Sequence, residues 1–269
     1  MLVPMNRPNF RTVIGTGSVE YINHMGDDLT VVNSARVSFN KESGWDSDDA
    51  MKEKALRNGA TADEADLMSH KLSDVDCKLL RYLAKHKHWT PFAHPQITFR
   101  IKAPIPIRTQ FFKHKQGFVE NECSRRYVSD PPEYYLPFWR SRSEKSVKQG
   151  SGEFLTGSDI VDAVTCYSDV LQVSSHMYST LVNKLGVCPE QARFALPQGV
   201  LTEWYWTGSL SAFARFFRQR IDPHAQWEIR RYAVTIGEFM GILFPESWAA
   251  LIHDLQDIKV PAVPEPPAE

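Results

Sequence analysis

The order of the expected strands and helices constrains this fold most. Residues 96–102, QITFRIK, alternate apolar and polar side chains, a pattern typical of a strand with one buried face. The aromatic stretch 201–207, LTEWYWT, is a second strand candidate that lies much further along the chain. Helical patterns predominate between these strands and around them. Because strands and helices do not alternate regularly, we expect an α+β fold.

Capping residues indicate where the helices begin. We expect Asp28 to cap a helix over 28–39, and Asp74 to cap one over 75–87. A helix from about Ile107 is expected to carry Gln110 and Lys113 one turn apart. The other helix signals are Asp159 at the start of 159–185, Pro189 in the first turn of 189–196, Ser209 before 210–220, and the apolar positions of 224–244.

Length and composition predict one folded unit. The chain has 269 residues, of which 42% are hydrophobic, and this is enough to bury a sizeable core. We expect a single domain over 1–259, with polar insertions at about 42–73 and 140–158. The Pro-rich tail, 260–269, is predicted to be disordered.

The balance of charge and the apolar patterning disfavour several classes of protein. Lys and Arg number 31 against 32 for Asp and Glu, so nucleic-acid binding through bulk positive charge is not expected. No apolar run is long enough to span a bilayer, so we expect no membrane segment. The N-terminus lacks the apolar region of a signal peptide, which favours a cytoplasmic location.

The cysteines and histidines give no metal signal. The four cysteines show no CxxC pairing, which fits a reduced compartment without structural zinc. His86, His88 and His94 are close in sequence, but no acidic residue lies at a ligand spacing, so we predict no metal site. Cys123 has no base nearby in the sequence, and Cys188 is expected to pack at a helix start, so neither is predicted to be a nucleophile.

The stretch 110–127, QFFKHKQGFVENECSRRY, concentrates side chains that bind anions and flat heterocycles. Cations suit a phosphate, whereas amides and carboxylates suit the edge of a ring. The stretch therefore predicts a nucleotide or cofactor site, with a solvated basic helix end and loop as the alternative. The candidates are Gln110, Lys113, His114, Lys115, Glu122, Ser124, Arg125 and Arg126.

Five separated segments resemble motifs of the flavin-dependent thymidylate synthases. They are ARVSF with Ser38, HWTPFAH ending at His94, QFFKHK…NECSRRY, ARFALP with Arg193, and RQRIDPHAQWEIRRYA with Arg220 and His224. Their order and approximate spacing match the family from about residue 15 to residue 244. The resemblance implies that family's fold, with a central, mostly antiparallel sheet flanked by long helices.

The chain departs from the family inside its signature. Where the family has Arg-His-Arg, this chain has Lys113, His114 and Lys115. The spacer to Ser124 is one residue longer than usual, and Arg125 stands where a small residue is common. Lysine keeps the charge but lacks the planar fork that binds two oxygens at once, so the exchange bears on substrate identity more than on the fold.

The resemblance implies an enzyme that uses FAD as cofactor, methylenetetrahydrofolate as co-substrate and NADPH as reductant. Its reaction would convert dUMP to dTMP, in a homotetramer whose sites are shared between subunits. The altered signature motivates an alternative on the same fold, in which dCMP or dUMP is 5-hydroxymethylated because water quenches the methylene. A nucleic-acid-binding module built on KHKHW and FFKHK is an alternative of a different class.

The resemblance also assigns roles to individual residues. Ser124, which would position the pyrimidine, and Arg220, which would polarise its carbonyl group, are the predicted catalytic residues. Arg126 and Arg193 are the main candidates for binding the phosphate. The predicted substrate-binding residues are Gln110, Glu122, Ser124, Arg125, Arg126, Arg193 and Arg220. The predicted cofactor-binding residues are Ser38, His94, Lys113, His114, Lys115, Glu122, Arg215 and His224.

Overall fold

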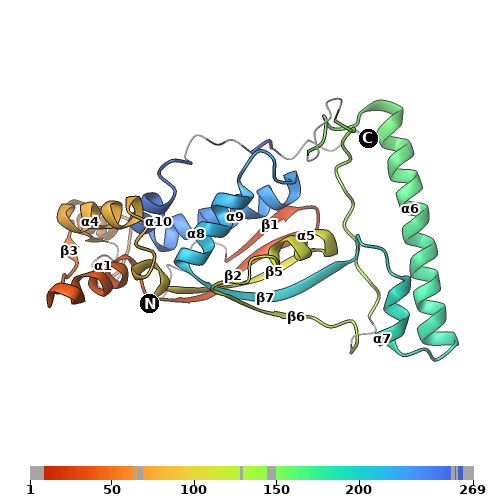
Figure 1. The fold of residues 1–269 in the computed structure, drawn as a ribbon, viewed down its shortest axis with the longest axis horizontal. Coiled ribbons are helices and arrows are strands. Elements are labelled where there is room, and N and C mark those ends of the chain that lie inside the picture. The colour runs from red at the N-terminus through yellow and green to blue at the C-terminus, as the bar shows by residue number, and fades with distance from the viewer. Residues whose placement is uncertain are drawn as a thin grey trace.

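A five-stranded antiparallel sheet forms the centre of the protein (Figure 1). The structure, a computed structural model, describes residues 9–62, 65, 69–127, 130–143, 150–255, 258 and 260–262. The strand order is β1-β2-β5-β7-β6, and every neighbouring pair is antiparallel. This sheet and the helices around it confirm the predicted α+β class. The strands are β1 (Phe10–Ile14), β2 (Gly17–Met25), β5 (Gln96–Pro104), β7 (Leu201–Ser209) and β6 (Phe118–Glu122).

The two predicted strands, β5 and β7, lie side by side within the sheet. Ile97, Phe99 and Ile101 of β5 are fully buried, as their alternation predicts. β7 pairs with β5 along its whole length, which brings Trp206 opposite Phe99. Both strands therefore contribute large side chains to one apolar core.

Sequence patterns do not reveal β1, β2 and β6. A tight turn joins β1 to β2, and Gly15 in that turn has a φ of 52°, which glycine adopts without strain. β6 is an edge strand of sequence FVENE, and Phe118 is its one buried residue. An edge strand needs little apolar surface, so its composition carries a weak strand signal.

Helices α8 (Leu210–Arg220) and α9 (Trp227–Leu243) pack together over one face of the sheet (Figure 1). α8 begins as predicted, because the Ser209 hydroxyl accepts a hydrogen bond from the Ala212 amide at 3.2 Å. This cap fixes the direction in which α8 leaves the end of β7. The last turn of α8, with Arg218 and Arg220, therefore lies at the end of the helix away from its junction with β7.

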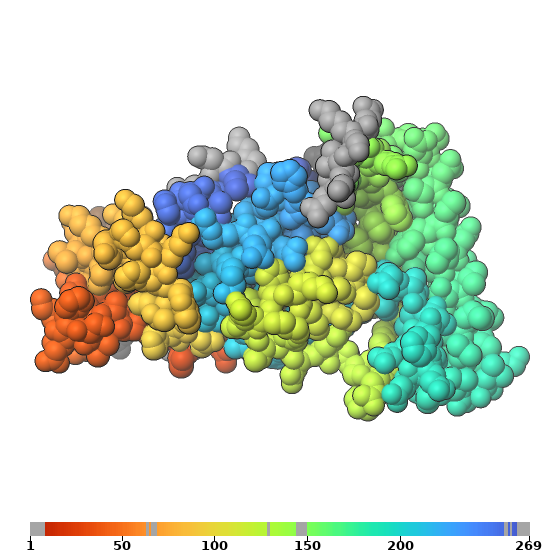
Figure 2. Space-filling model, viewed as in Figure 1, coloured from red at the N-terminus to blue at the C-terminus, as the bar shows by residue number. Residues whose placement is uncertain are grey.

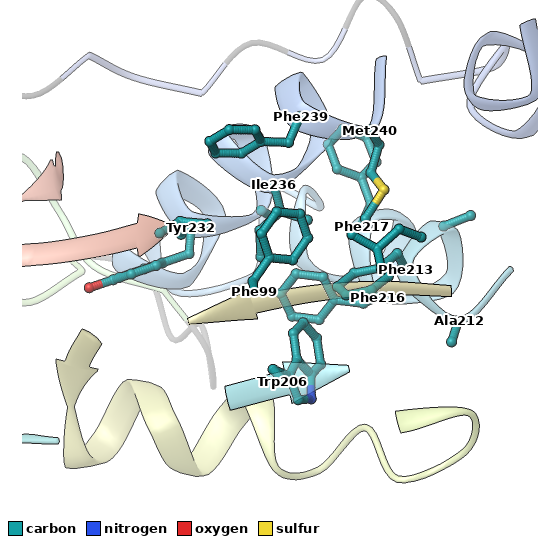
Figure 3. Close-up of a cluster of buried hydrophobic side chains, with 14 of the residues drawn as sticks. Phe99, Trp206, Ala212, Phe213, Phe216, Phe217, Tyr232, Ile236, Phe239 and Met240 are labelled. Carbon is teal, nitrogen blue, oxygen red and sulfur yellow. The ribbon is translucent and has the colours of Figure 1, made fainter. Parts of the chain in front are cut away.

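Aromatic side chains fill the space between the sheet and α8 (Figure 3). The ring of Trp206 lies 5.0 Å from the rings of both Phe213 and Phe216, and Phe99 lies 5.4 Å from Phe213. These contacts are edge-to-face, the arrangement that aromatic quadrupoles favour. The aromatic cluster holds α8 in one position on the sheet.

The first helices begin one residue away from the expected caps. α1 (Asp28–Arg36) is capped by Asp27. Asp28 is instead buried, and its carboxylate accepts hydrogen bonds from the amides of Glu246 and Ser247, each at 2.9 Å. The prediction that Asp28 is the cap is therefore wrong, because a tertiary contact with the start of α10 (Pro245–Leu251) uses this side chain.

The same shift occurs at α4 (Asp74–Lys85). The Ser73 hydroxyl caps this helix by accepting from the Asp76 amide at 3.2 Å, so Asp74 is not the cap. Adjacent residues that both suit a cap, Ser73 and Asp74, leave the start undecided by sequence. A tertiary contact favours Ser73, because its hydroxyl also donates to Oδ2 of the buried Asp76 at 2.8 Å, and Asp76 pairs with Arg36 of α1.

Helix α5 (Ile105–Phe111) begins and ends earlier than predicted. Pro106 lies in its first turn, where the missing amide hydrogen is tolerated, so the helix starts before Ile107. Lys113 lies beyond its end, and the expectation that Gln110 and Lys113 share a helical turn is wrong.

The long helix α6 (Gly157–Ser179) stands apart from the sheet (Figures 1 and 2). A π-helical turn, Thr180–Lys184, continues it, and the short helix α7 (Pro189–Ala192) follows. The other end of the molecule carries α1, α4 and the small elements β3 (Asp46–Ser47), α2 (Asp49–Arg57) and β4 (His70–Lys71). Within the described part of the chain, no helix is both long and apolar enough to cross a membrane.

The insertion and tail predictions fall partly outside the described residues. The described part of 42–73 contains β3, α2 and β4, while 63, 64 and 66–68 lie outside the description. In 140–158, Arg140 and Phe154 form a bridge, while 144–149 lie outside the description, as do 263–269 of the tail. The limits of the single domain remain a prediction.

Candidate active site

A large polar cavity lies where α8 ends and α9 begins. Its volume is about 1040 Å³, and its described lining includes Gln110 and the loop from Gly150 to Phe154. Four arginines line it, with one histidine and two acidic residues. The basic side chains are Arg140, Arg218, Arg220, Arg230 and His224, and the acidic ones are Glu153 and Asp222. The cavity is therefore suited to an anionic ligand of considerable size.

Arg220 is held by the signature segment. Its Nε donates a hydrogen bond to Nε2 of His114 at 2.9 Å, and its Nη2 donates to the carbonyl of Gln110 at 3.1 Å. A guanidinium has no acceptor, so Nε2 of His114 must accept, and the imidazole carries its hydrogen on Nδ1. The structure thus brings together three predicted site residues from two segments of the chain.

His114 is neutral in this arrangement. It is 7% exposed, and its ring meets that of Phe216 edge-to-face at 5.0 Å. Burial, together with the positive charges of Arg220 and Arg215, lowers the pKa of His114 to about 4. At neutral pH the imidazole therefore remains an acceptor for Arg220, whose own pKa burial also lowers.

Gln110, predicted to bind the substrate, and His224, predicted to bind the cofactor, both line the large cavity. The Gln110 amide donates to Oε1 of Gln226 at 2.7 Å, which ties α5 to the start of α9. His224 is exposed, and its Nδ1 lies 2.9 Å from Oδ1 of Asp222. Both side chains are oriented by neighbours on the α8–α9 connection.

A second, smaller cavity of about 290 Å³ lies between α5, the end of β6 and the segment before β7. Four predicted residues line it, namely Glu122, Ser124, Arg125 and Arg193. Arg108 also lines it, although the sequence reasoning did not select this residue. Its one sequence signal is a position two residues before Gln110, on the helix that carries the signature.

Arg126 lies beside this smaller cavity rather than in its lining. Its Nε is 3.2 Å from a carboxylate oxygen of Glu190, in α7, and its side chain is well exposed. The Nε of Arg193 donates to the Glu190 carbonyl at 3.1 Å. Both arginines that are predicted to bind phosphate, Arg126 and Arg193, therefore contact Glu190 at one edge of the cavity.

Lys113, Lys115 and Arg215 do not line either of these two cavities. Lys113 and Lys115 are exposed in the turn after α5, and Lys115 forms an ion pair with Glu120. Arg215 donates to the carbonyl of Gln116. In a single chain, the two signature lysines and Arg215 therefore lie outside the linings of both cavities.

Ser38 and His94 lie at the other end of the molecule. Ser38 is exposed in the 3₁₀ turn that directly follows α1, and α1 and α7 are at opposite ends of the long axis (Figure 1). His94 is exposed after a 3₁₀ turn, Pro91–Ala93, that contacts α1. One chain therefore does not assemble all of the predicted cofactor residues.

The residues present suit a flavin better than a metal. The large cavity combines a volume typical of a cofactor site with several cations that match a pyrophosphate. Among the described residues, no three His, Cys, Asp or Glu side chains form a group that could hold a metal ion. The donor set is therefore that of an anion and heterocycle site.

Comparison with known proteins agrees with this chemistry. A family model described as thymidylate synthase complementing protein matches residues 20–246. A flavin-dependent thymidylate synthase of Thermus thermophilus is 33% identical over 251 residues, which cover 93% of this chain and 81% of that protein. The corresponding protein of Thermotoga neapolitana is 31% identical over 240 residues, covering 89% and 93%.

The fold is also found among solved structures. A UMP/dUMP methylase PolB from Streptomyces cacaoi, bound with 5-Br dUMP, aligns with a TM-score of 0.69 at 24% identity, over 89% of this chain and 96% of that one. The resemblance inferred from the five motifs is thereby confirmed. The chain belongs to the thymidylate synthase complementing protein family, whose curated relatives are flavin-dependent thymidylate synthases.

Proposed function

We propose that the protein converts dUMP to dTMP by transferring the one-carbon unit of methylenetetrahydrofolate to C5 of the pyrimidine. The methylene would leave the nitrogen of the folate, releasing tetrahydrofolate, and C5 would lose its proton. A bound reduced FAD would supply the hydride that completes the methyl group, and NADPH would reduce the flavin again. One observation carries the proposal. Arg220, fixed by neutral His114 and by the Gln110 carbonyl, lines a cofactor-sized cationic cavity in a chain of this family.

Arg220 would polarise the pyrimidine carbonyl. A guanidinium beside that oxygen stabilises negative charge as it develops there, so C5 becomes more nucleophilic. Among the described residues, the hydrogen bonds of Arg220 use Nε and Nη2, which leaves Nη1 for a ligand. His114 is thus a positioning residue, since it acts through Arg220.

The smaller cavity would hold the nucleotide phosphate. Arg193 and Arg125 line it, and Arg126 lies at its edge next to Glu190. Charge-assisted hydrogen bonds of this kind contribute about 1.5–3 kcal/mol each. Ser124, beside Arg125 in the same lining, would position the substrate; no nearby base makes it a nucleophile.

The large cavity would hold the flavin. Gln110, Arg220 and His224 supply polar groups, and Arg230 adds positive charge for a pyrophosphate. Arg218, also in the lining, is paired with the Asp254 carboxylate through two hydrogen bonds of 2.6 Å. His114, which bonds to Arg220, and Lys113, Lys115 and Arg215 are further candidates, as is Glu122, which lines the smaller cavity. When bound, a reduced flavin supplies the hydride that converts methylene to methyl.

We propose that the active site is completed by other copies of the chain in a homotetramer. Neither Ser38 nor His94 lines either of the two cavities within one chain, which supports sharing between subunits. α6 carries an exposed apolar stripe, Val170, Val173 and Met177, spaced at i, i+3 and i+7. Such a stripe on a helix that stands off from the core is typical of an interface.

The mass of the product nucleotide tests the proposal. Purified protein is incubated with dUMP or dCMP, methylenetetrahydrofolate, FAD and NADPH. We expect dTMP from dUMP, with NADPH consumed in equal amount. A hydroxymethyl product, particularly from dCMP and without consumption of NADPH, would replace this proposal by 5-hydroxymethylation on the same fold.

A flavin measurement separates the enzyme from the nucleic-acid-binding alternative. We expect a yellow protein with flavin absorbance, and His114→Ala should lower flavin occupancy because it also releases Arg220. Full occupancy and unchanged activity in His114→Ala would contradict the role given to the signature. A cytoplasmic location stays a prediction.

A further inference from the structure

The smaller cavity contains a cation that no motif of the sequence singles out. Arg108 of α5 lines it with Arg125 and Arg193, while Glu122 supplies a carboxylate. The described lining therefore has three guanidinium groups against one carboxylate, an excess of two positive charges. Such an excess in a cavity of this size favours a small, doubly charged anion.

Arg108 is held in place before any ligand arrives. Its Nε lies 3.0 Å from Oε1 of Glu122, and its guanidinium carbon lies 5.1 Å from the ring centre of Phe112. The same Glu122 oxygen accepts a hydrogen bond from the Thr202 hydroxyl at 2.7 Å, which anchors the carboxylate to β7. A cation fixed in this way loses little freedom when it binds a ligand.

The terminal nitrogens of Arg108 are available to a ligand. With the described residues, its polar contact is the Nε contact to Glu122, so Nη1 and Nη2 form no hydrogen bond there. These two nitrogens keep the planar geometry that matches two phosphate oxygens. Arg125 and Arg193 each already donate to a backbone carbonyl, of Asp130 and Glu190 respectively.

We infer that Arg108 binds the phosphate of the substrate nucleotide, with Glu122 holding its guanidinium in position. This inference rests on the proposed function, since it assumes that a nucleoside monophosphate occupies the site. The smaller cavity thus receives a cation from α5, the helix that also carries Gln110 at the large cavity. One short helix therefore lines both cavities.

Binding measurements on Arg108→Gln test the inference. The probes are dUMP, deoxyuridine and inorganic phosphate, measured by calorimetry on the flavin-loaded protein. We expect dissociation constants for dUMP and phosphate to rise roughly 10- to 100-fold, and that for deoxyuridine to stay unchanged. Arg57→Gln, which removes an exposed arginine paired with Glu53 in α2, is the matched control and should change none of them.

Arg108→Lys keeps the positive charge beside Glu122 but removes the planar guanidinium that can bind two phosphate oxygens. It is a second variant that still tests the inference if Arg108→Gln fails to fold. It should weaken dUMP and phosphate binding to a smaller extent and leave deoxyuridine unaffected. Equal losses for dUMP and deoxyuridine, or unchanged binding of dUMP and phosphate, would overturn the inference.

The probes also separate the inference from the proposed function. If the unaltered protein binds phosphate but not dUMP, and Arg108→Gln abolishes phosphate binding, the role of Arg108 stands and the pyrimidine assignment fails. If the unaltered protein binds neither dUMP nor phosphate, both fail.

Discussion

The sheet with α8 and the end formed by α6 and α7 bury their apolar side chains to different degrees. Trp206 is fully buried and stacks on Phe118 at 4.0 Å, within a cluster of aromatic rings. At the other region, Phe194 is 85% exposed and Val173 of α6 is 65% exposed. The core is complete within one chain, whereas the α6–α7 region presents apolar surface that another copy can cover.

The predicted site residues are divided between these two regions. Arg220 and His114 belong to the core side, since the aromatic cluster fixes α8 and Phe216 packs against the imidazole. Ser124, Arg125 and Arg193 belong to the side that faces α7. We therefore expect polarising residues to be preorganised in each chain, and the phosphate-binding side to be sensitive to assembly.

The largest effect should come from truncating the core. Trp206→Ala removes a fully buried indole and should lower the free energy of unfolding by about 3–5 kcal/mol. Phe194→Ala is the matched control, measured at a protein concentration low enough to keep the chain monomeric, where the exposed ring should contribute within about 0.5 kcal/mol. Denaturant unfolding measures both, and similar losses would erase the contrast between the two regions.

The next effect concerns assembly. Val170→Asp with Val173→Asp places two charges on the exposed stripe of α6, and each would be desolvated in a subunit interface. We expect the dissociation constant of the oligomer to rise at least about 100-fold, roughly 3 kcal/mol. Sedimentation and far-UV circular dichroism report assembly and folding separately.

An unchanged oligomer in this double variant would place the interface elsewhere. Val161→Asp, nearer the start of α6 and off the stripe, is the control and should affect assembly less.

A smaller effect should appear on acidification. The pKa of His114 is about 4 in the folded protein, below the ordinary value of about 6.5 that applies when it is unfolded. As pH falls from about 6.5 to about 5.5, the unfolded chain takes up the proton first, so stability decreases by up to about 1.4 kcal/mol over this unit, and the loss continues until the folded pKa is reached.

His114→Gln cannot titrate and still offers an acceptor to Arg220, so it isolates this proton. Chemical denaturation at several pH values should show a steeper acid loss for the unaltered protein than for the variant. Parallel curves would mean that His114 titrates normally.

The smallest effect on stability should come from restoring the family signature. Lys113→Arg with Lys115→Arg preserves charge at two exposed positions, so the free energy of unfolding should change by less than about 0.5 kcal/mol. If the lysines only substitute for arginines, dTMP formation should hold or improve. A loss of activity or a change of product mass would show that the lysines belong to a retuned site.

Local patterns predicted much of the fold. The alternation of Ile97, Phe99 and Ile101 predicted β5, because a two-residue period places one face of a strand in the core. The Ser209 cap predicted the start of α8 for a similarly local reason. Five motifs in order predicted the family, since each carries side chains of a definite chemistry at a definite place in the chain.

Local patterns could not predict contacts between segments that are distant in the sequence. The Asp28 carboxylate bonds to amides at the start of α10, so it is not free to cap α1. β6 is a strand because β7 offers it an open edge, although its own sequence is mostly polar. The local spacing of apolar and polar residues predicts neither the role of Asp28 nor the strand β6.

By itself, the sequence determined the class of fold, the family, and which residue types gather at the site, because those follow from periodicity, caps and motif order. Only the tertiary structure decided that Arg220 bonds to His114 across 106 positions of the chain. It likewise placed Arg108 with Glu122 in the smaller cavity. The physical reason is that hydrogen bonding and burial depend on distance in space, and packing of α5 against the sheet and α8 sets that distance.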